Sequence, residues 1–252
     1  MSAFFASYRN ECEKLLRRKK YIVFLFIGLA VCAVWTLLGR ILTDFIRMQS
    51  GYFFVFTPTP MGALPFFLQI FVPFLMFMAA TDLITVEGAE NTMKAAMCRP
   101  VERWKLYASK ILAVETYAAA YLGCIFVICA LLTQTLGKAL AINELLTAFA
   151  SYALTLIPLL ILACFAALVA LFGRSGTLVM FLLILFYIAL NALPVFFPVL
   201  TEMLFTSYLG WHRLWIGALP GASKLLHMLV IVLGYGTVFF TAGSLLFDRK
   251  DY

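Results

Sequence analysis

Charged residues are scarce in this sequence. Asp, Glu, Lys and Arg make up 12% of the 252 residues, whereas they make up about a quarter of a typical soluble domain. This scarcity excludes an ordinary soluble globular domain. Hydrophobic residues reach 64%, and the mean hydropathy is +1.01. We therefore expect a single integral membrane domain spanning residues 1–252.

A phosphate-binding loop is also missing. That motif requires Gly, four residues and then Gly-Lys-Ser/Thr. The one Gly-Lys pair, Gly137-Lys138, is followed by Ala, and Leu132 stands where the first Gly is needed. Nucleotide hydrolysis in this chain is therefore not expected.

Metal-ligating patterns are missing as well. The sequence has no His-Glu-x-x-His motif, and its two histidines, His212 and His227, have no candidate co-ligands at a suitable spacing. None of the six cysteines falls in an expected outer loop, so no structural disulfide is predicted. We expect no metal and no cofactor in this chain.

What the sequence has instead is long apolar runs. Each of six runs is long enough to cross a hydrocarbon core of about 30 Å as an α-helix. An all-α fold follows, because backbone polar groups in lipid must be satisfied within each helix. The predicted spans are residues 21–39, 66–86, 106–133, 145–172, 177–199 and 225–247.

The placement of Lys and Arg predicts the orientation. Fourteen of the 19 basic residues lie in the segment before the first span, in two alternate loops and at the C-terminus. Cytoplasmic segments carry such an excess, so we expect a multi-pass protein of a bacterial cell membrane with both termini in the cytoplasm. The same bias explains the net charge of +7 without nucleic acid as a partner.

The segment 1–20 has an amphipathic helical pattern. Its apolar residues recur near one helical face and its charged residues occupy the rest. An amphipathic helix lying on the inner leaflet is expected, and a simple membrane anchor explains the composition equally well. The expected apolar face consists of Phe4, Phe5, Tyr8, Cys12, Leu15 and Leu16.

The longest cytoplasmic segment, 87–105, has a helical pattern of its own. Met93, Ala96 and Met97 fall on one face, while Glu90 and Lys94 form an (i, i+4) pair. Pro100 should end this helix. One interpretation of the segment is a positively charged anchor that only fixes the membrane topology.

These residues resemble a cytoplasmic loop of type-2 ATP-binding-cassette (ABC-2) permeases. The family pattern has an acid, Gly-Thr, Arg-Pro-Val, Arg and then Lys at the start of the third span. The matching residues are Glu87, Asn91, Thr92, Arg99, Pro100, Val101, Arg103 and Lys110. The sequence departs from the pattern at Asn91, where the family more often has Gly.

The resemblance implies partners and a role for the loop. In this family the loop docks on separate ATPase subunits, which bind the ATP and Mg, and a second permease, identical or related, completes the transporter in the lipid membrane. It also implies re-entrant or interfacial helices in the outer loop 200–224. The coupling residues implied are Glu87, Glu90, Asn91, Thr92, Met93, Lys94, Met97, Arg99, Pro100 and Arg103.

Ionisable residues inside spans are costly and usually paired. Asp82, Lys110 and Glu115 lie near the inner ends of the second and third spans. We expect Lys110 to pair with Asp82 or Glu115 in a structural cluster, with a proton relay as the alternative. Asn191, in the fifth span, is a candidate for an interhelical hydrogen bond or for the substrate path.

The sequence thus predicts the permease subunit of an ATP-driven exporter, not an enzyme. Its size and aromatic outer loops are similar to those of permeases for bacitracin and lantibiotics, which suggests an amphipathic, lipid-like or peptide-antibiotic substrate. A membrane scaffold or assembly factor without transport is the alternative, followed by an intramembrane enzyme.

Overall fold

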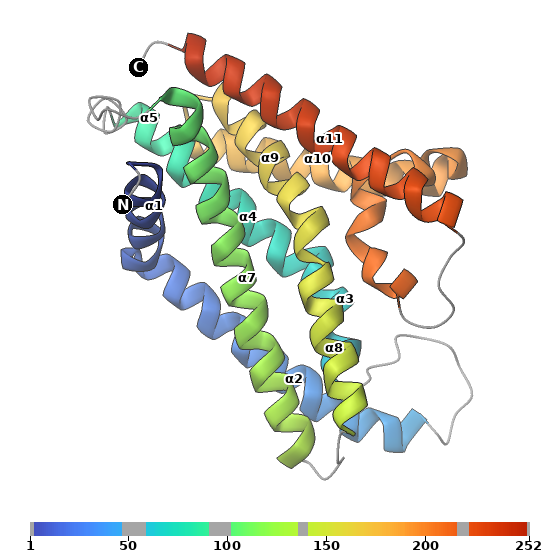
Figure 1. Ribbon diagram of the computed structural model, residues 1–252. Helices are drawn as coiled ribbons and strands as arrows, with labels where there is room; N and C mark the ends of the chain where they lie inside the picture. Colours follow the sequence, from blue (N-terminus) through green and yellow to red (C-terminus); the bar gives the residue numbers. More distant parts are fainter. Residues whose placement is uncertain (1–2, 47–58, 91–101, 136–140, 216–221, 251–252) are drawn as a thin grey trace.

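The computed structural model describes residues 3–46, 59–90, 102–135, 141–215 and 222–250. Every regular element in these ranges is helical, and six helical stretches are long and apolar enough to cross a membrane. The predicted all-α fold with six such helices is confirmed. Figure 1 shows the stretches packed side by side, with the short helix α1 (Ala3–Arg17) beside one end of α7.

The six stretches have the following bounds. The first is α2 (Lys19–Ile46), the third is α7 (Arg103–Thr135), the fifth is α10 (Gly176–Phe196) and the sixth is α11 (Ala222–Arg249). The second runs without interruption through α3 (Pro60–Phe66), η1 (Phe67–Phe71), α4 (Val72–Ala80), η2 (Thr81–Val86) and α5 (Glu87–Ala89). The fourth consists of α8 (Ile142–Leu154) and α9 (Leu156–Phe172).

The second stretch begins at Pro60, ahead of the predicted start at residue 66, because a cap precedes it. The Thr59 side chain accepts a hydrogen bond from the Gly62 amide at 3.2 Å. Pro60 occupies the first helical turn, where its missing N–H costs nothing. Hydropathy alone does not detect such a cap.

Two parts of the second stretch are π-helical. They are η1 near one end and η2 near the other. A π-helix places its hydrogen bonds one residue further along than an α-helix does, and such turns occur often at functional sites. Each of the two π segments adjoins one of the polar regions described below.

Helix α7 is central to the packing. It contacts α1, α2, α4, α9 and α11. Glycine allows one of these close approaches, because a Cβ added at Gly243 of α11 would lie 2.0 Å from the Tyr107 hydroxyl of α7. A side chain at Gly243 would therefore require the Tyr107 ring or α11 to move.

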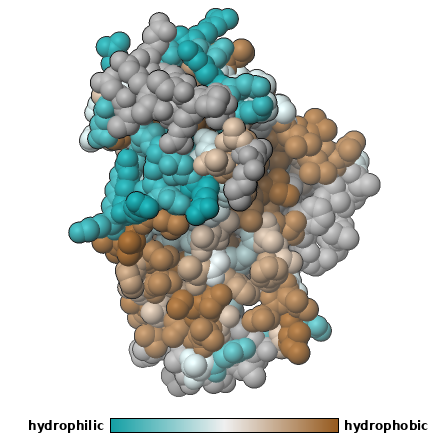
Figure 2. Space-filling model, turned by 60° about the vertical axis from the view of Figure 1, so that its left-hand side comes forward, coloured by the Kyte–Doolittle hydropathy of each residue, from teal (hydrophilic) through white to brown (hydrophobic). Residues whose placement is uncertain are grey.

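One end of the bundle gathers segments that are far apart in the sequence. Arg103 forms an ion pair with Asp248 near the C-terminus, at 3.9 Å between Nε and Oδ1. Lys250 donates a hydrogen bond to the carbonyl of Leu171, at the end of α9. Figure 1 places α1, α5 and the C-terminus at this end, and Figure 2 shows hydrophilic side chains gathered there above a hydrophobic surface.

The segment 198–215 contains two 3-10 helices. They are η3 (Pro198–Glu202) and η4 (Phe205–Trp215). Phe205, Tyr208 and Leu209 of η4 are buried, and η4 contacts α8, α9, α10 and α11. Part of the segment therefore folds into the bundle.

Candidate functional site

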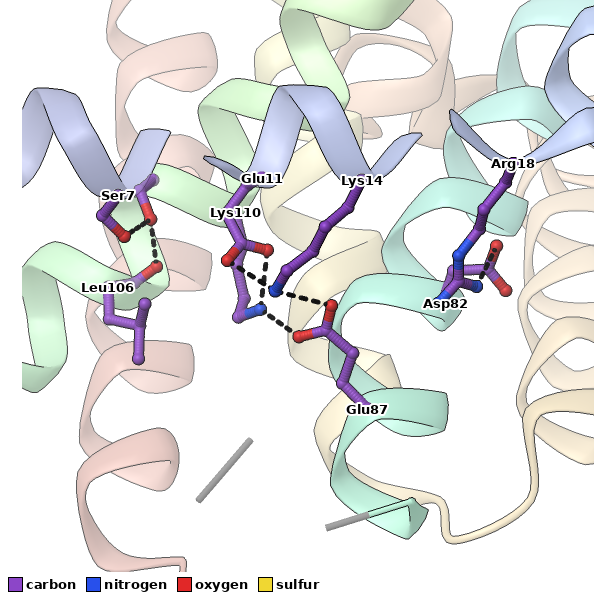
Figure 3. Close-up of polar contacts among 9 residues, drawn as sticks. Ser7, Glu11, Lys14, Arg18, Asp82, Glu87, Leu106 and Lys110 are labelled. Atoms are coloured by element: carbon purple, nitrogen blue, oxygen red, sulfur yellow. Dashed lines mark hydrogen bonds and ion pairs between the residues drawn. The ribbon is translucent and has the colours of Figure 1, made fainter. Parts of the chain in front are cut away.

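Four charged side chains form a closed cycle at the end that carries α1. Lys110 Nζ lies 2.9 Å from Glu11 Oε2 and 2.7 Å from Glu87 Oε2. Lys14 Nζ lies 2.9 Å from Glu11 Oε1 and 2.9 Å from Glu87 Oε1. Acids and bases alternate around the cycle, which Figure 3 shows. We call Glu11, Lys14, Glu87 and Lys110 the charge ring.

The charge ring is buried and electrically balanced. The exposed fractions of the side chains are 0% for Lys110, 1% for Glu11, 5% for Glu87 and 31% for Lys14. Burying an isolated ion is expensive, and the attraction of its partners offsets that cost only when the geometry is good. Here each carboxylate pairs through both of its oxygens, one to each lysine. Because the ring has two acids and two bases, removing any one member leaves an unbalanced charge inside the protein.

The charge ring joins three separate parts of the chain. Glu11 and Lys14 are one turn apart on α1, which places them on one face. Glu87 begins α5 at the end of the second stretch, and Lys110 lies two turns into α7. Glu87 and Lys110 thus flank the segment 91–101 on its two sides. Both flanks of that segment are bound to α1 through the same four side chains.

The partners of Glu11 and Lys14 determine their charge states. Burial by itself would raise the pKa of Glu11, but the nearby Lys110 and Lys14 ammonium groups outweigh it and hold that pKa below its ordinary value. Burial would lower the pKa of Lys14, but Glu11 and Glu87 outweigh it and raise that pKa. Both groups are therefore charged at neutral pH.

A second cluster of charges surrounds Asp82, which lies on η2. Asp82 Oδ2 is 2.9 Å from Arg18 Nη1 and 2.5 Å from Lys20 Nζ. The Tyr21 hydroxyl donates a hydrogen bond to the same oxygen at 2.7 Å. This cluster connects the start of α2 to η2, next to the charge ring (Figure 3).

These contacts correct the predicted pairing within the spans. Lys110 contacts neither Asp82 nor Glu115 in the part of the chain described, and each of the three has a different environment. Both carboxylate oxygens of Glu115 are buried, and no hydrogen-bond partner is found for them among the described residues. The prediction failed because α1 folds back onto α7 and supplies partners from outside the spans.

The amphipathic helix predicted for residues 1–20 packs one of its sides against the rest of the protein as α1. The helix is present, but the side chains that it buries are Ser7, Glu11 and Leu15. Phe5 and Leu16, expected on the apolar face, are 47% and 61% exposed. The Ser7 hydroxyl lies 3.1 Å from that of Ser109 on α7. A strip of Ser7, Glu11 and Leu15 thus contacts the protein, while Phe5 and Leu16 stay exposed on the side that was predicted to face lipid.

The predicted coupling residues fall into two groups. Glu87 belongs to the charge ring, Glu90 is exposed and Arg103 binds Asp248. Glu87 therefore faces into this chain. The remaining predicted coupling residues lie outside the described residues: Asn91, Thr92, Met93, Lys94, Met97, Arg99 and Pro100.

Sequence reasoning missed Glu11, Lys14 and Arg18 as members of buried clusters. The (i, i+3) spacing of Glu11 and Lys14 was a usable signal, because it places an acid and a base on one face of α1. It could not identify Glu87 and Lys110 as their partners, since that depends on where α1 packs.

Comparison with known protein families gives a match to a family model. Residues 8–191 match the family model described as ABC-2 family transporter protein. The matched range includes all four members of the charge ring and both flanks of the segment 91–101. No curated protein sequence matches the chain significantly.

Proposed function

We propose that this chain, which belongs to the ABC-2 family of transporter membrane proteins, is the permease subunit of an ATP-driven exporter. ABC-2 permeases generally pair with separate nucleotide-binding ATPase subunits, so ATP and Mg would be bound by the partner. The substrate we propose is amphipathic, of the lipid-like or peptide-antibiotic kind, and a second permease would complete the transporter.

The charge ring is the observation that carries the coupling part of this proposal. A partner that moves the segment 91–101 pulls on Glu87 from one side and on Lys110 from the other. Both residues are bound to Glu11 and Lys14 of α1. A displacement of the segment would therefore move α1, the end of the second stretch and the start of α7 together.

The proposed orientation places this end in the cytoplasm. Support comes from the gathering of α1, α5, the start of α7 and the C-terminal residue Lys250 at one end of the bundle. The sequence segments 1–20, 87–110 and 249–250 hold 13 of the 19 Lys and Arg residues of the chain, as expected for a cytoplasmic face. An ATPase in the cytoplasm would then meet the segment 91–101 directly.

The contact with the ATPase can be tested by two substitutions on one face of the expected helix. Met93→Asp with Met97→Asp places two carboxylates where an apolar contact is proposed, and burying them without partners costs several kcal/mol. Ala95→Asp with Cys98→Asp is the matched control, because helical spacing places these positions on the opposite face. Each permease is co-expressed with the proposed partner ATPase.

We expect the Met93/Met97 variant to reach the membrane at the normal level but to lose co-purification with the ATPase and ATP-dependent transport. The Ala95/Cys98 variant should retain both. Retention of the ATPase by the Met93/Met97 variant at the unsubstituted level would refute docking through this face. ATPase binding without transport of any amphipathic substrate would instead favour a scaffold.

A further inference from the structure

A polar pocket lies at the opposite end of the second stretch from the charge ring. It has a volume of about 270 Å³ and lies between η1, α10 and η4. The lining residues come from all three elements and from Pro65 of α3: Pro65, Leu68, Gln69, Tyr187, Asn191, Thr206, Ser207, Leu209 and Gly210. We call this cavity the η1 pocket.

Uncharged hydrogen-bonding groups give the η1 pocket its character. Of the described residues that line it, none is charged, while Gln69 and Asn191 contribute amides and Thr206 and Ser207 contribute hydroxyls. Amide and hydroxyl side chains both donate and accept hydrogen bonds. Such a lining suits a neutral group with several donors and acceptors, because a charged group would lose its hydration without gaining an opposite charge.

Internal hydrogen bonds position the walls of the pocket. The Tyr187 hydroxyl donates to the carbonyl of Gln69 at 3.0 Å, which ties α10 to η1. The Asn191 side-chain amide donates to the carbonyl of Tyr187 at 2.8 Å. The side-chain oxygen of Asn191 is not used by this bond. The walls are thus fixed by bonds that leave acceptor capacity in the cavity.

Thr206 supplies an independent sign that a ligand belongs in the η1 pocket. The residue is 4% exposed, and its hydroxyl is buried with no hydrogen-bond partner among the described residues. Leaving a buried hydroxyl unsatisfied costs about 1–3 kcal/mol. A ligand hydroxyl in the pocket would remove that cost.

The size of the pocket and the surface around it limit the class of ligand further. A volume of about 270 Å³ is at the lower end for small-molecule sites, which begin at about 300 Å³, so it suits a head group rather than a whole amphiphile. Ile70 and Ile188, next in sequence to Gln69 and Tyr187, are 56% and 60% exposed. An apolar tail has a surface to follow outside the pocket.

We infer that the η1 pocket binds the neutral, hydroxyl-bearing head group of an amphiphile whose tail lies in the lipid. As a cargo site this inference rests on the proposed transport function and defines the substrate class more closely. The pocket can bind such a ligand whether or not the chain transports it. The binding inference and the transport proposal can therefore fail separately.

The test uses the full chain in phosphatidylcholine nanodiscs. The probe is n-decyl β-D-glucoside with a photoreactive diazirine in its alkyl chain, and decylphosphocholine with the same diazirine is the zwitterionic comparison. We expect saturable glucoside labelling that maps to η1, α10 or η4. Thr206→Val should weaken its apparent affinity about 3- to 10-fold, the size of one hydrogen bond. Thr206→Ser should retain the affinity.

Two further variants make the result specific. Asn191→Leu should also weaken glucoside labelling, and it provides the test if Thr206→Val does not fold. Thr201→Val is the control, because Thr201 is an exposed threonine of η3 that does not line the pocket. Non-saturable labelling, equal labelling by the phosphocholine probe, or unchanged affinity in both pocket variants would overturn the inference. Saturable labelling in a chain that transports nothing would leave the site intact and refute transport alone.

Discussion

The two π-helical segments of the second stretch adjoin two very different polar regions. Near η2, the charged side chains of the charge ring and of the Asp82 cluster are paired with each other. Near η1, uncharged side chains line an open pocket, and the Thr206 hydroxyl has no partner among the described residues. Complete pairing makes a rigid connection between helices, whereas incomplete pairing leaves capacity for a ligand.

Under the proposed function, this difference gives the two ends separate tasks. The charge ring brings together α1, α5 and α7 and holds both flanks of the segment 91–101. The η1 pocket brings together η1, α10 and η4 around a small volume. A permease needs both a connection to its energy source and a place for its cargo. The same helical stretch runs between the two regions.

The largest effect is expected from breaking the charge ring at Lys110. Lys110→Met leaves the Glu11 and Glu87 carboxylates with Lys14 alone, and removing one partner of a buried ion pair typically costs about 3–5 kcal/mol. We expect a large loss of folded protein in size-exclusion profiles and a clearly lower thermal midpoint. Lys105→Met is the matched control, because Lys105 pairs with exposed Glu102.

Restoring the charge balance should reverse part of that loss. Adding Glu87→Gln to Lys110→Met leaves one acid and one base, Glu11 and Lys14, so yield should rise. Adding Asp82→Asn should not help, because Asp82 pairs with Arg18 and Lys20. A Lys110→Met protein as stable as the Lys105→Met control would contradict the importance of the charge ring.

The pH dependence of stability should come from the charge ring and not from the η1 pocket. Because the pKa of Glu11 is lowered by folding, its contribution is complete above the ordinary carboxyl pKa and is lost as pH falls through the lowered value. Because the pKa of Lys14 is raised, its contribution is complete below the ordinary lysine pKa and is lost as pH rises through the raised value. We expect a plateau between about pH 5 and pH 10.

Thermal midpoints measured across this range give the test, with Glu11→Gln as the comparison. That variant should be less stable on the plateau and should lose stability less steeply on acidification, since residue 11 no longer takes up a proton. An acid limb of unchanged steepness in Glu11→Gln would assign the acid sensitivity to other carboxylates. Thr206→Val should leave the whole profile unchanged, because the η1 pocket has no charged lining residue among those described.

The smallest effect is expected at Thr206 itself, in the absence of a ligand. Thr206→Val removes a buried hydroxyl that has no partner among the described residues and replaces it with a methyl group of similar size. We expect the stability to stay within about 0.5 kcal/mol of the unsubstituted protein or to rise. A loss of more than 1 kcal/mol, on that same scale, would show that the hydroxyl is already satisfied within the protein.

Local sequence patterns predicted the helices well. Six apolar runs identified six helical stretches, because hydrocarbon solvent requires each run to satisfy its own backbone. The boundaries moved where local chemistry extends a helix beyond its apolar run, as the Thr59 cap does. The two π segments have no recognised signal in the hydropathy pattern, so η1 and η2 were not predicted.

The polar sites depend on tertiary packing, which local patterns do not contain. Lys110 was correctly singled out as a buried charge that needs partners, but the sequence did not identify them. They are Glu87 of α5 and Glu11 of α1, which is about a hundred residues away in sequence. The amphipathic pattern of α1 predicted a helix at the membrane surface but not its contact with α7, where Ser109 and Lys110 offer polar partners to Ser7 and Glu11. No sequence pattern identified Thr206 as a residue of a binding site.

The most direct test of the account is the coupling between Lys14 on α1 and Glu87 at the flank of the segment 91–101. We propose a double-mutant cycle of Lys14→Met and Glu87→Gln, with reversible unfolding in mixed micelles as the measurement. Each single change unbalances the charge ring, whereas the double variant leaves Glu11 and Lys110 as a neutral pair. The account predicts that the double variant is more stable than the sum of the single effects by about 1 kcal/mol or more. Additive effects within about 0.5 kcal/mol would contradict the claim that α1 is bound to the loop flank through this ring.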